Sequence, residues 1–156
     1  MVTNLYKSIL KNSPDGYIFH RVYDKVLMQI DIHRIEDVNN SFLKLFELDL
    51  DDEPLRQVSD FFKQFDANEA FNWGIYFRNC LSSQDLYTTE FYYHQKKKWI
   101  SLSSYIVEDY LITFARDISA KKKEAIQKNK LLNYEWKMLS MVAEQSPVSI
   151  VVTDIE

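Results

Sequence analysis

Cysteine, glycine and proline are scarce in this sequence. Its 156 residues include one cysteine, two glycines and three prolines. A single cysteine, Cys80, cannot form a disulfide within the chain, and no spacing of cysteine and histidine matches a zinc site. Gly16 and Gly74 alone cannot build a glycine-rich phosphate-binding loop. These scarcities exclude a disulfide scaffold, a zinc module and a nucleotide-binding loop, and they fit a reducing cytoplasmic setting.

An excess of basic charge and a long apolar run are also lacking. The net charge is -4, and the two lysine runs, at residues 96–98 and 121–123, are short enough to be solvated surface. Nucleic acid and anionic lipid attract clustered Lys and Arg, so neither is an expected partner. No stretch approaches the roughly 18 apolar residues that span a bilayer, and the first residues lack a signal-peptide pattern. We expect a cytoplasmic fragment without membrane contact. Its parent protein can still be anchored to a membrane through another segment.

What the sequence does contain is apolar residues in regular patterns. Hydrophobic residues make up 46% of the chain and aromatic residues 15%, enough to bury the core of one domain. The patterns predict a helix over 3–12, strands over 17–22 and 26–32, a short helix capped by residues 37–41, irregular segments over 48–65, a helix over 68–81 and strands over 86–93, 99–107 and 110–118. This order predicts an α+β domain with a five-stranded antiparallel sheet, an N-terminal helix and short helices on one face.

A charged helix is predicted from Ser119 to Ala143, without proline or glycine. Ile118, Ala125, Leu132 and Leu139 recur every seven residues, and the companion positions are mixed. This pattern favours an adjustable coiled coil and a homodimer. The alternative is a single amphipathic helix that lies on its own domain.

Three phrases in the sequence resemble the PAS family of sensory and interaction domains in bacterial signalling proteins. They are residues 12–19, at the entry to the first strand, residues 35–42, with an asparagine at Asn39, and residues 114–119, which contain the closing Asp-Ile-Ser. The likeness covers residues 3–119 and implies a PAS-type sheet. Two departures from the family pattern stand out: no glycine follows the first short helix near Glu47, and residues 95–98 replace a tight Asp-Gly turn.

The chain also repeats itself. Residues 144–152 echo residues 11–19, and Pro147 lies 133 residues after Pro14. We therefore divide the chain into a PAS sensory domain at 1–118, a helical signalling linker at 119–143 and the truncated start of a second PAS-like domain at 144–156.

Cofactors used by PAS relatives find little support in the residues. The phrase Arg78-Asn79-Cys80 resembles the flavin-binding motif of blue-light receptors, but it lies in the wrong helix, so covalent flavin is not expected. The predicted helix over 68–81 holds no histidine for haem. His20, His33 and His94 are scattered over strands or turns, as surface or hydrogen-bonded histidines, and no metal site is expected. The cofactor is left open.

A PAS-like fold implies a small cavity between the sheet and its helices. Its lining is predicted to contain Phe42, Leu45, Phe61, Trp73, Phe77, Tyr105 and Phe114. The alternative is that these side chains pack closely and leave no cavity.

The expected function is sensory and non-catalytic. By the resemblance, the domain binds a small ligand or relays a signal to a histidine kinase or a cyclic-dinucleotide enzyme downstream in the same protein. Asp117 is the predicted hinge and Ser119 the predicted helix cap of this relay, against the alternative of a static cap. A ligand-free scaffold for dimerisation and a small α+β enzyme remain alternative functions.

Overall fold

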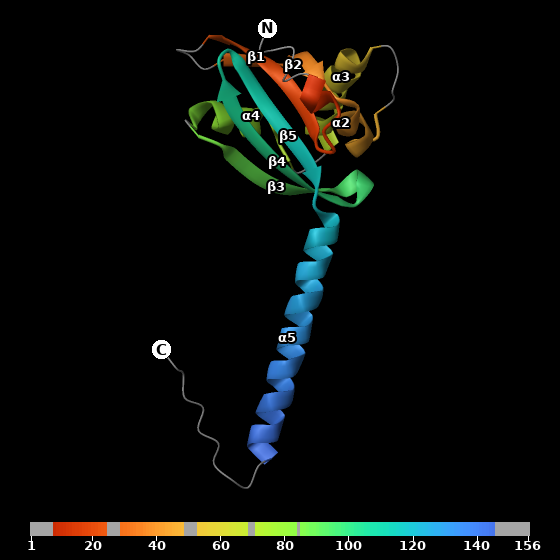
Figure 1. The fold of residues 1–156 in the computed structure, drawn as a ribbon, viewed down its shortest axis with the longest axis vertical. Helices are drawn as coiled ribbons and strands as arrows, with labels where there is room; N and C mark the ends of the chain where they lie inside the picture. The colour runs from red at the N-terminus through yellow and green to blue at the C-terminus, as the bar shows by residue number, and fades with distance from the viewer. Residues whose placement is uncertain (1–7, 25–28, 49–52, 69–70, 84, 146–156) are drawn as a thin grey trace. The chain divides into compact units, whose positions relative to one another are not determined.

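The computed structural model describes residues 8–24, 29–48, 53–68, 71–83 and 85–145. Residues 8–11 are helical, within the predicted N-terminal helix. The labelled elements that follow are shown in Figure 1. In chain order they are β1 (Gly16–Asp24), β2 (Gln29–Val38), α2 (Asn40–Leu45), α3 (Pro54–Asn68), α4 (Trp73–Ser82), β3 (Tyr87–Tyr93), β4 (Lys98–Val107), β5 (Tyr110–Asp117) and α5 (Ser119–Gln145), with a 3-10 turn at His94–Lys96 between β3 and β4.

The five strands form one sheet in the order β2-β1-β5-β4-β3. Every neighbouring pair is antiparallel, which confirms the predicted sheet. The last strand in sequence, β5, lies at the centre of the sheet and pairs with β1 and β4. The strand that leads into α5 is therefore the middle strand of the sheet, with two strands on either side.

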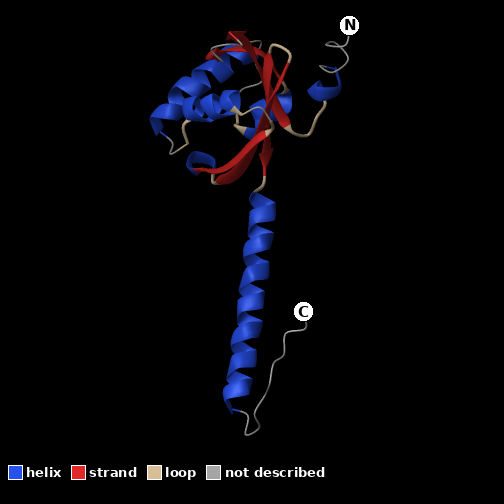
Figure 2. Ribbon diagram, turned by 90° about the vertical axis from the view of Figure 1, so that its left-hand side faces the viewer, coloured by secondary structure: helices blue, strands red, loops and turns tan. Residues whose placement is uncertain are grey.

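The helices between β2 and β3 lie together on one side of the sheet (Figure 2). Side chains alternate between the two faces of a strand, so each strand contributes every second residue to the core beneath these helices. Ile18, Leu102 and Leu111 are fully buried there. On the other face, Tyr17 and Ile112 belong to a separate, smaller apolar cluster.

The irregular segments predicted between residues 48 and 65 are wrong, because α3 is a continuous helix of 15 residues. Pro54 occupies its first position, where a proline disrupts no hydrogen bond. The helix buries Val58, Phe61, Phe62 and Phe65, which recur at helical spacing. Pro54 therefore starts a helix, and tertiary burial of its aromatic stripe stabilises that helix.

The next helix also begins later than predicted. Asn68 is the last residue of α3, and α4 begins at Trp73. The Asn72 side chain accepts a hydrogen bond from the Ile75 amide at 2.8 Å and so caps α4. The predicted helix over 68–81 therefore combines the end of one helix with most of another.

The second strand extends beyond its predicted end at Ile32. It runs from Gln29 to Val38 as an edge strand, and its pairing with β1 is irregular at three places. Asp31 and Arg34 are exposed, as edge positions allow. The prediction missed the second half of this strand because the sequence after Ile32 is polar. The predicted start at Val26 lies outside the described residues.

The amide of Asn39 joins three parts of the domain. Its Oδ1 accepts hydrogen bonds from the Tyr17 amide at 2.9 Å and the Phe42 amide at 3.0 Å. Its Nδ2 donates to the carbonyl oxygens of Asp15 at 2.9 Å and Leu10 at 3.3 Å. The side chain is only 2% exposed. Asn39 thus caps α2 and fixes it to the start of β1 and to the N-terminal segment.

Gly16 is required by the close approach of β1 to α2. A Cβ atom at this position would lie 2.7 Å from the Cα of Phe42, which is backbone and cannot move aside alone. The first residue of β1 and the first turn of α2 are therefore in direct backbone contact.

Residues 1–118 and 119–156 form two compact units. The second contains α5, which begins at Ser119 as predicted and ends at Gln145. Residues 146–156, which hold most of the predicted second PAS-like start, lie outside the described part. Among the described helices, none combines the length and hydropathy needed to cross a bilayer.

Replacing Gly16 by alanine is expected to destabilise the domain by about 1–3 kcal/mol, the usual cost of overpacking. Urea unfolding followed by circular dichroism measures the change. Gly74→Ala is the control, because its Cβ would meet only the Asn72 Oδ1, at 3.3 Å. Equal unfolding midpoints for the two variants would contradict the required contact.

Candidate functional site

A row of hydroxyl groups crosses the buried face of the sheet. The Tyr76 hydroxyl on α4 forms a 2.6 Å hydrogen bond with Ser104 Oγ on β4. Ser104 Oγ in turn forms a 2.6 Å hydrogen bond with Thr113 Oγ1 on β5. All three side chains are buried. The buried polar row therefore links a helix to the central strand through directional bonds inside an apolar core.

His20 and Cys80 lie buried in the same interior. His20 is fully buried on β1, with its ring centroid 4.8 Å from that of Phe77 and 6.0 Å from that of Phe62. From the sequence, His20 was predicted to be a surface or hydrogen-bonded histidine. The signal that it lies inward was its alternation with Ile18 and Val22, which are both core residues.

Burial determines the protonation states of Tyr76 and Cys80. It raises the pKa of the Tyr76 phenol, and the nearby Cys80 raises it further. It also raises the pKa of the Cys80 thiol, although hydrogen bonds with Ser104 and Tyr76 oppose that shift. Both groups stay protonated at neutral pH, so they can form hydrogen bonds but are poor nucleophiles or bases.

Aromatic side chains surround this interior closely. Trp73 is fully buried, with its ring centroid 4.8 Å from that of Phe62 and 5.7 Å from that of Phe77. Phe46 and Phe61 continue the cluster at 5.0 Å from each other. The rings meet mostly edge to face or tilted, as aromatic pairs in dense cores do.

The structure does not bring the seven predicted lining residues together. Five of them belong to the core between sheet and helices or pack against it: Phe42, Leu45, Phe61, Trp73 and Phe77. Tyr105 and Phe114 belong to the cluster on the opposite face, where their rings stack at 6.0 Å. Each is the immediate neighbour of an inward residue, Ser104 or Thr113, so strand alternation turns it outward.

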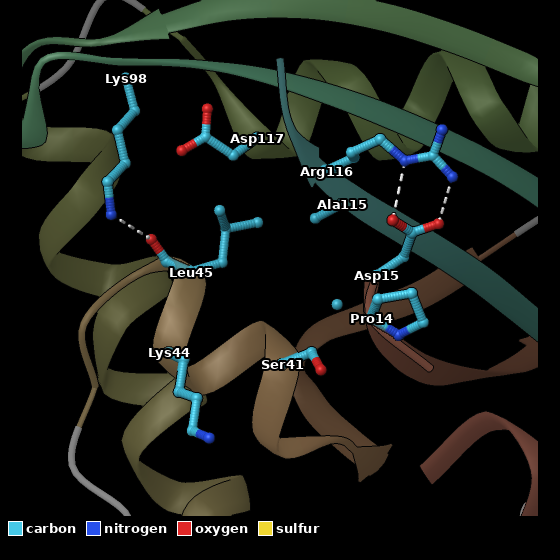
Figure 3. A pocket seen from close by; sticks show the side chains of 10 residues that line it. Pro14, Asp15, Ser41, Lys44, Leu45, Lys98, Ala115, Arg116 and Asp117 are labelled. Atoms are coloured by element: carbon cyan, nitrogen blue, oxygen red, sulfur yellow. Dashed lines mark hydrogen bonds and ion pairs between the residues drawn. The ribbon is translucent and has the colours of Figure 1, made fainter. Parts of the chain in front are cut away.

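A surface pocket of about 400 Å³ surrounds the end of β5. It is lined by residues 14–16, Ser41, Lys44, Leu45, Lys98 and residues 115–117. Figure 3 shows Arg116 paired with Asp15 on one side and Lys98 reaching the Leu45 carbonyl on the other. Asp117 lies at this pocket as the exposed last residue of β5, and Ser119 begins α5. Of the two predicted relay residues, Asp117 thus lines a charged, solvent-accessible pocket.

The two departures from the PAS pattern meet next to this pocket. Glu47 has a φ of 55°, the left-handed conformation that a glycine adopts most readily after a helix. Its carboxylate accepts hydrogen bonds from Lys96 at 2.6 Å and Lys98 at 3.2 Å. The hydrogen bond from Lys96 is the main cause that lowers the pKa of Glu47. Lys96 and Lys98 therefore bind Glu47, the residue that stands where the family pattern has a glycine.

A second cleft, of about 250 Å³, lies between α4 and the edge strand β3. Phe71, Tyr76 and Tyr87 contribute aromatic rings to it, and Asn79 and Thr89 contribute polar groups. The Asn79 Nδ2 donates a 3.2 Å hydrogen bond to the Tyr87 hydroxyl. Tyr76 belongs both to this α4–β3 cleft and to the buried polar row.

Metal-binding groups do not cluster in the part of the chain that the structure describes: no three His, Cys, Asp or Glu side chains there are placed to hold an ion. His94 is exposed, with its ring against Tyr92 at 4.9 Å. His33 belongs to β2. Cys80 is buried on α4, within the Arg78-Asn79-Cys80 phrase.

Comparison with known proteins assigns the first half of the chain to a family. Residues 4–79 match the family model described as PAS domain. The match includes β1, β2, α2 and α3 and reaches into α4, so it contains both Gly16 and Asn39. No curated protein matches the chain significantly.

Replacing Tyr76 by phenylalanine is expected to reduce the loss of stability at alkaline pH. Because burial raises the pKa of Tyr76 in the folded state, its stabilising contribution is complete below the unfolded value of about 10. The contribution is lost as the pH rises from there towards the folded-state pKa. Thermal melts measured from about pH 8 to pH 11 give the free energy of unfolding, which is expected to fall less steeply with pH for the variant than for the wild type. The two slopes are expected to differ by up to about 1.4 kcal/mol per pH unit.

The matched control is Tyr134→Phe, because Tyr134 is exposed on α5. This control is expected to retain the wild-type pH dependence. The same slope for Tyr76→Phe and the wild type would show that the Tyr76 proton is not coupled to folding.

Proposed function

Because this chain contains a PAS domain, we propose that it is a sensory and regulatory module of a bacterial signal-transduction protein. The domain receives a signal in or on its core and passes it through β5 to α5. The observation that carries the proposal is the position of β5. This strand is central in the sheet, contributes Thr113 to the buried polar row and is followed directly by α5.

The relay acts at residues 117–119. Asp117 ends β5 opposite Ile100, and the Ile118 amide donates a 2.8 Å hydrogen bond to the Trp99 carbonyl. Ser119 is the first residue of α5. A shift of β5 relative to β4 changes the direction in which the chain enters the helix, and Asp117 is the hinge where this change is absorbed.

Homodimerisation through α5 is the second part of the proposal. Leu132, Trp136 and Leu139 are exposed on this helix, and so are Leu131 and Met138. Leucines at 132 and 139 continue the seven-residue spacing that begins at Ile118. Apolar side chains at this spacing are stabilised by burial against the same stripe of a second copy.

The protonation of the buried groups supports a non-catalytic role for the chain itself. Tyr76 and Cys80 are held in their neutral forms, which suits recognition better than acid-base or nucleophilic chemistry. In the proposal, catalysis belongs to a cytoplasmic effector of the same protein, a histidine kinase or a cyclic-dinucleotide enzyme.

A ligand-free scaffold is the second candidate function, and the dense aromatic packing favours it. Trp73, Phe62 and Phe77 occupy the region between sheet and helices, where a bound ligand would require them to move. A scaffold shares the dimer and the relay through β5 with the sensory module. The two functions differ in whether a small molecule controls them.

Replacing Asp117 by alanine is expected to change the basal activity of the effector and to reduce its response to the signal, because the hinge loses its carboxylate. Effector activity of the full-length protein measures this effect. Asp85→Ala, at an exposed residue before β3, is the control and is expected to leave the response intact. Unchanged signalling in Asp117→Ala would remove Asp117 from the relay.

Sedimentation velocity at micromolar concentrations tests the dimer. The wild-type chain is expected to sediment as a dimer that dissociates on dilution. The double variant Leu132→Glu, Leu139→Glu is expected to be monomeric, because it introduces two charges into the apolar stripe. The control Asn133→Glu, Ser140→Glu makes the same changes one position along the helix and is expected to remain dimeric. A wild-type monomer at all concentrations would rule out this interface.

A further inference from the structure

We propose that the α4–β3 cleft binds a small, uncharged aromatic molecule of one or two rings, and that this molecule is the signal that the domain receives. The proposal rests on the sensory function proposed above and adds the site and the class of its ligand. The site lies at the edge of the packed interior and shares Tyr76 with it. Its occupation therefore does not require the aromatic cluster around Trp73 to open.

The volume of the cleft limits the size of the ligand. An apolar cavity of about 150 Å³ holds one benzene molecule. The α4–β3 cleft provides about 250 Å³ and opens to solvent at the edge of the sheet. One ring, or two fused rings, with a short polar substituent fits this space.

The walls of the cleft favour an aromatic ligand. Phe71 is held in place by stacking on Phe91, with ring centroids 4.1 Å apart. Tyr76 and Tyr87 lie across from each other, with ring centroids 5.6 Å apart. A flat ligand can make stacked or edge-to-face contacts with such rings, and these contacts add to the gain from burying apolar surface.

The polar groups at the cleft favour an uncharged ligand. Asn72, Asn79 and Thr89 line it together with the aromatic rings, and its described lining contains no Asp, Glu, Lys, Arg or His side chain. The Asn79 amide oxygen and the Thr89 hydroxyl can form hydrogen bonds with an amide or a ring nitrogen. A charged ligand would lose hydration there without gaining an opposite charge.

Tyr76 connects the cleft to the relay. Its side chain lines the cleft, and its hydroxyl group bonds Ser104, which bonds Thr113 on β5. Thr113 lies four residues before Asp117 on the same strand. A ligand that displaces the Tyr76 ring alters the 2.6 Å hydrogen bond to Ser104, and this change reaches the central strand directly.

Amide NMR titration of the full chain tests the site with defined probes. Benzamide and indole are the neutral aromatic probes, and benzoate and benzylammonium are charged probes of similar size. Both neutral probes are expected to cause saturable shifts at Ile75, Asn79, Tyr87 and Thr89, and the charged probes to bind at least about tenfold more weakly. No saturable shifts with the neutral probes, or equal affinity for benzoate, would overturn the proposal.

A pair of variants on β3 locates the binding. Thr89→Phe fills the cleft and is expected to abolish the shifts, whereas Thr88→Phe changes an exposed residue beside it and is expected to retain them. If Thr89→Phe does not fold, Asn79→Ala, at an exposed position of α4, is used in its place. This variant is expected to lower the affinity for benzamide several-fold. Full binding by a folded Thr89→Phe, or by Asn79→Ala used in its place, would overturn the site.

Tyr76→Phe tests the connection to β5. This variant keeps the ring in the cleft and removes the hydroxyl, so benzamide is expected to bind but no longer to shift the amides of Thr113 and Asp117. Shifts there equal to those of the wild type would overturn the connection. Failure of binding would leave the relay of the proposed function standing, because the Asp117→Ala measurement tests that relay independently.

Discussion

The buried amide of Asn39 is the interaction on which the arrangement of this domain depends. It uses both acceptor positions and both donor hydrogens, and its four partners belong to the N-terminal segment, β1 and α2. Because an unpaired buried amide is costly, these segments can only assemble together. The same arrangement brings the backbone of Phe42 against Gly16, so that α2 covers the sheet and Phe42 enters the core. The aromatic packing above the sheet follows from this placement.

The core contains two kinds of interaction with different consequences. Aromatic contacts around Trp73 fill space and tolerate small displacements, because they are numerous and only broadly directional. The hydrogen bonds from Tyr76 to Ser104 and Thr113 are few, short and directional. A displacement of α4 therefore acts on β4 and β5 mainly through the buried polar row. That difference makes the row a suitable connection between the α4–β3 cleft and the central strand.

Compensation explains how the chain departs from the family pattern without losing the fold. A left-handed glutamate at position 47 is less favourable than a glycine, but Lys96 in the turn between β3 and β4 and Lys98 at the start of β4 bind its carboxylate. These ion pairs are exposed, so each contributes little by itself. Together they connect α2 to the hairpin beside the pocket at the end of β5. Two changes that look independent in the sequence are thus one structural unit.

The sequence by itself determined the elements whose signal is local. Alternating aromatic and β-branched residues predicted β3, β4 and β5 almost to the residue, residues 37–41 predicted the cap of α2, and Ser119 predicted the start of α5. Only the tertiary structure decided which residues share a site, because that depends on the face each strand presents and on its neighbours. Tyr105 and Phe114 turned out to face away from the helices, while His20 faces inward and Ser104 meets Tyr76 from a distant helix. Helix α3 was missed although Val58, Phe61, Phe62 and Phe65 recur at helical spacing. The burial that stabilises this stripe comes from tertiary packing, which the sequence does not show directly.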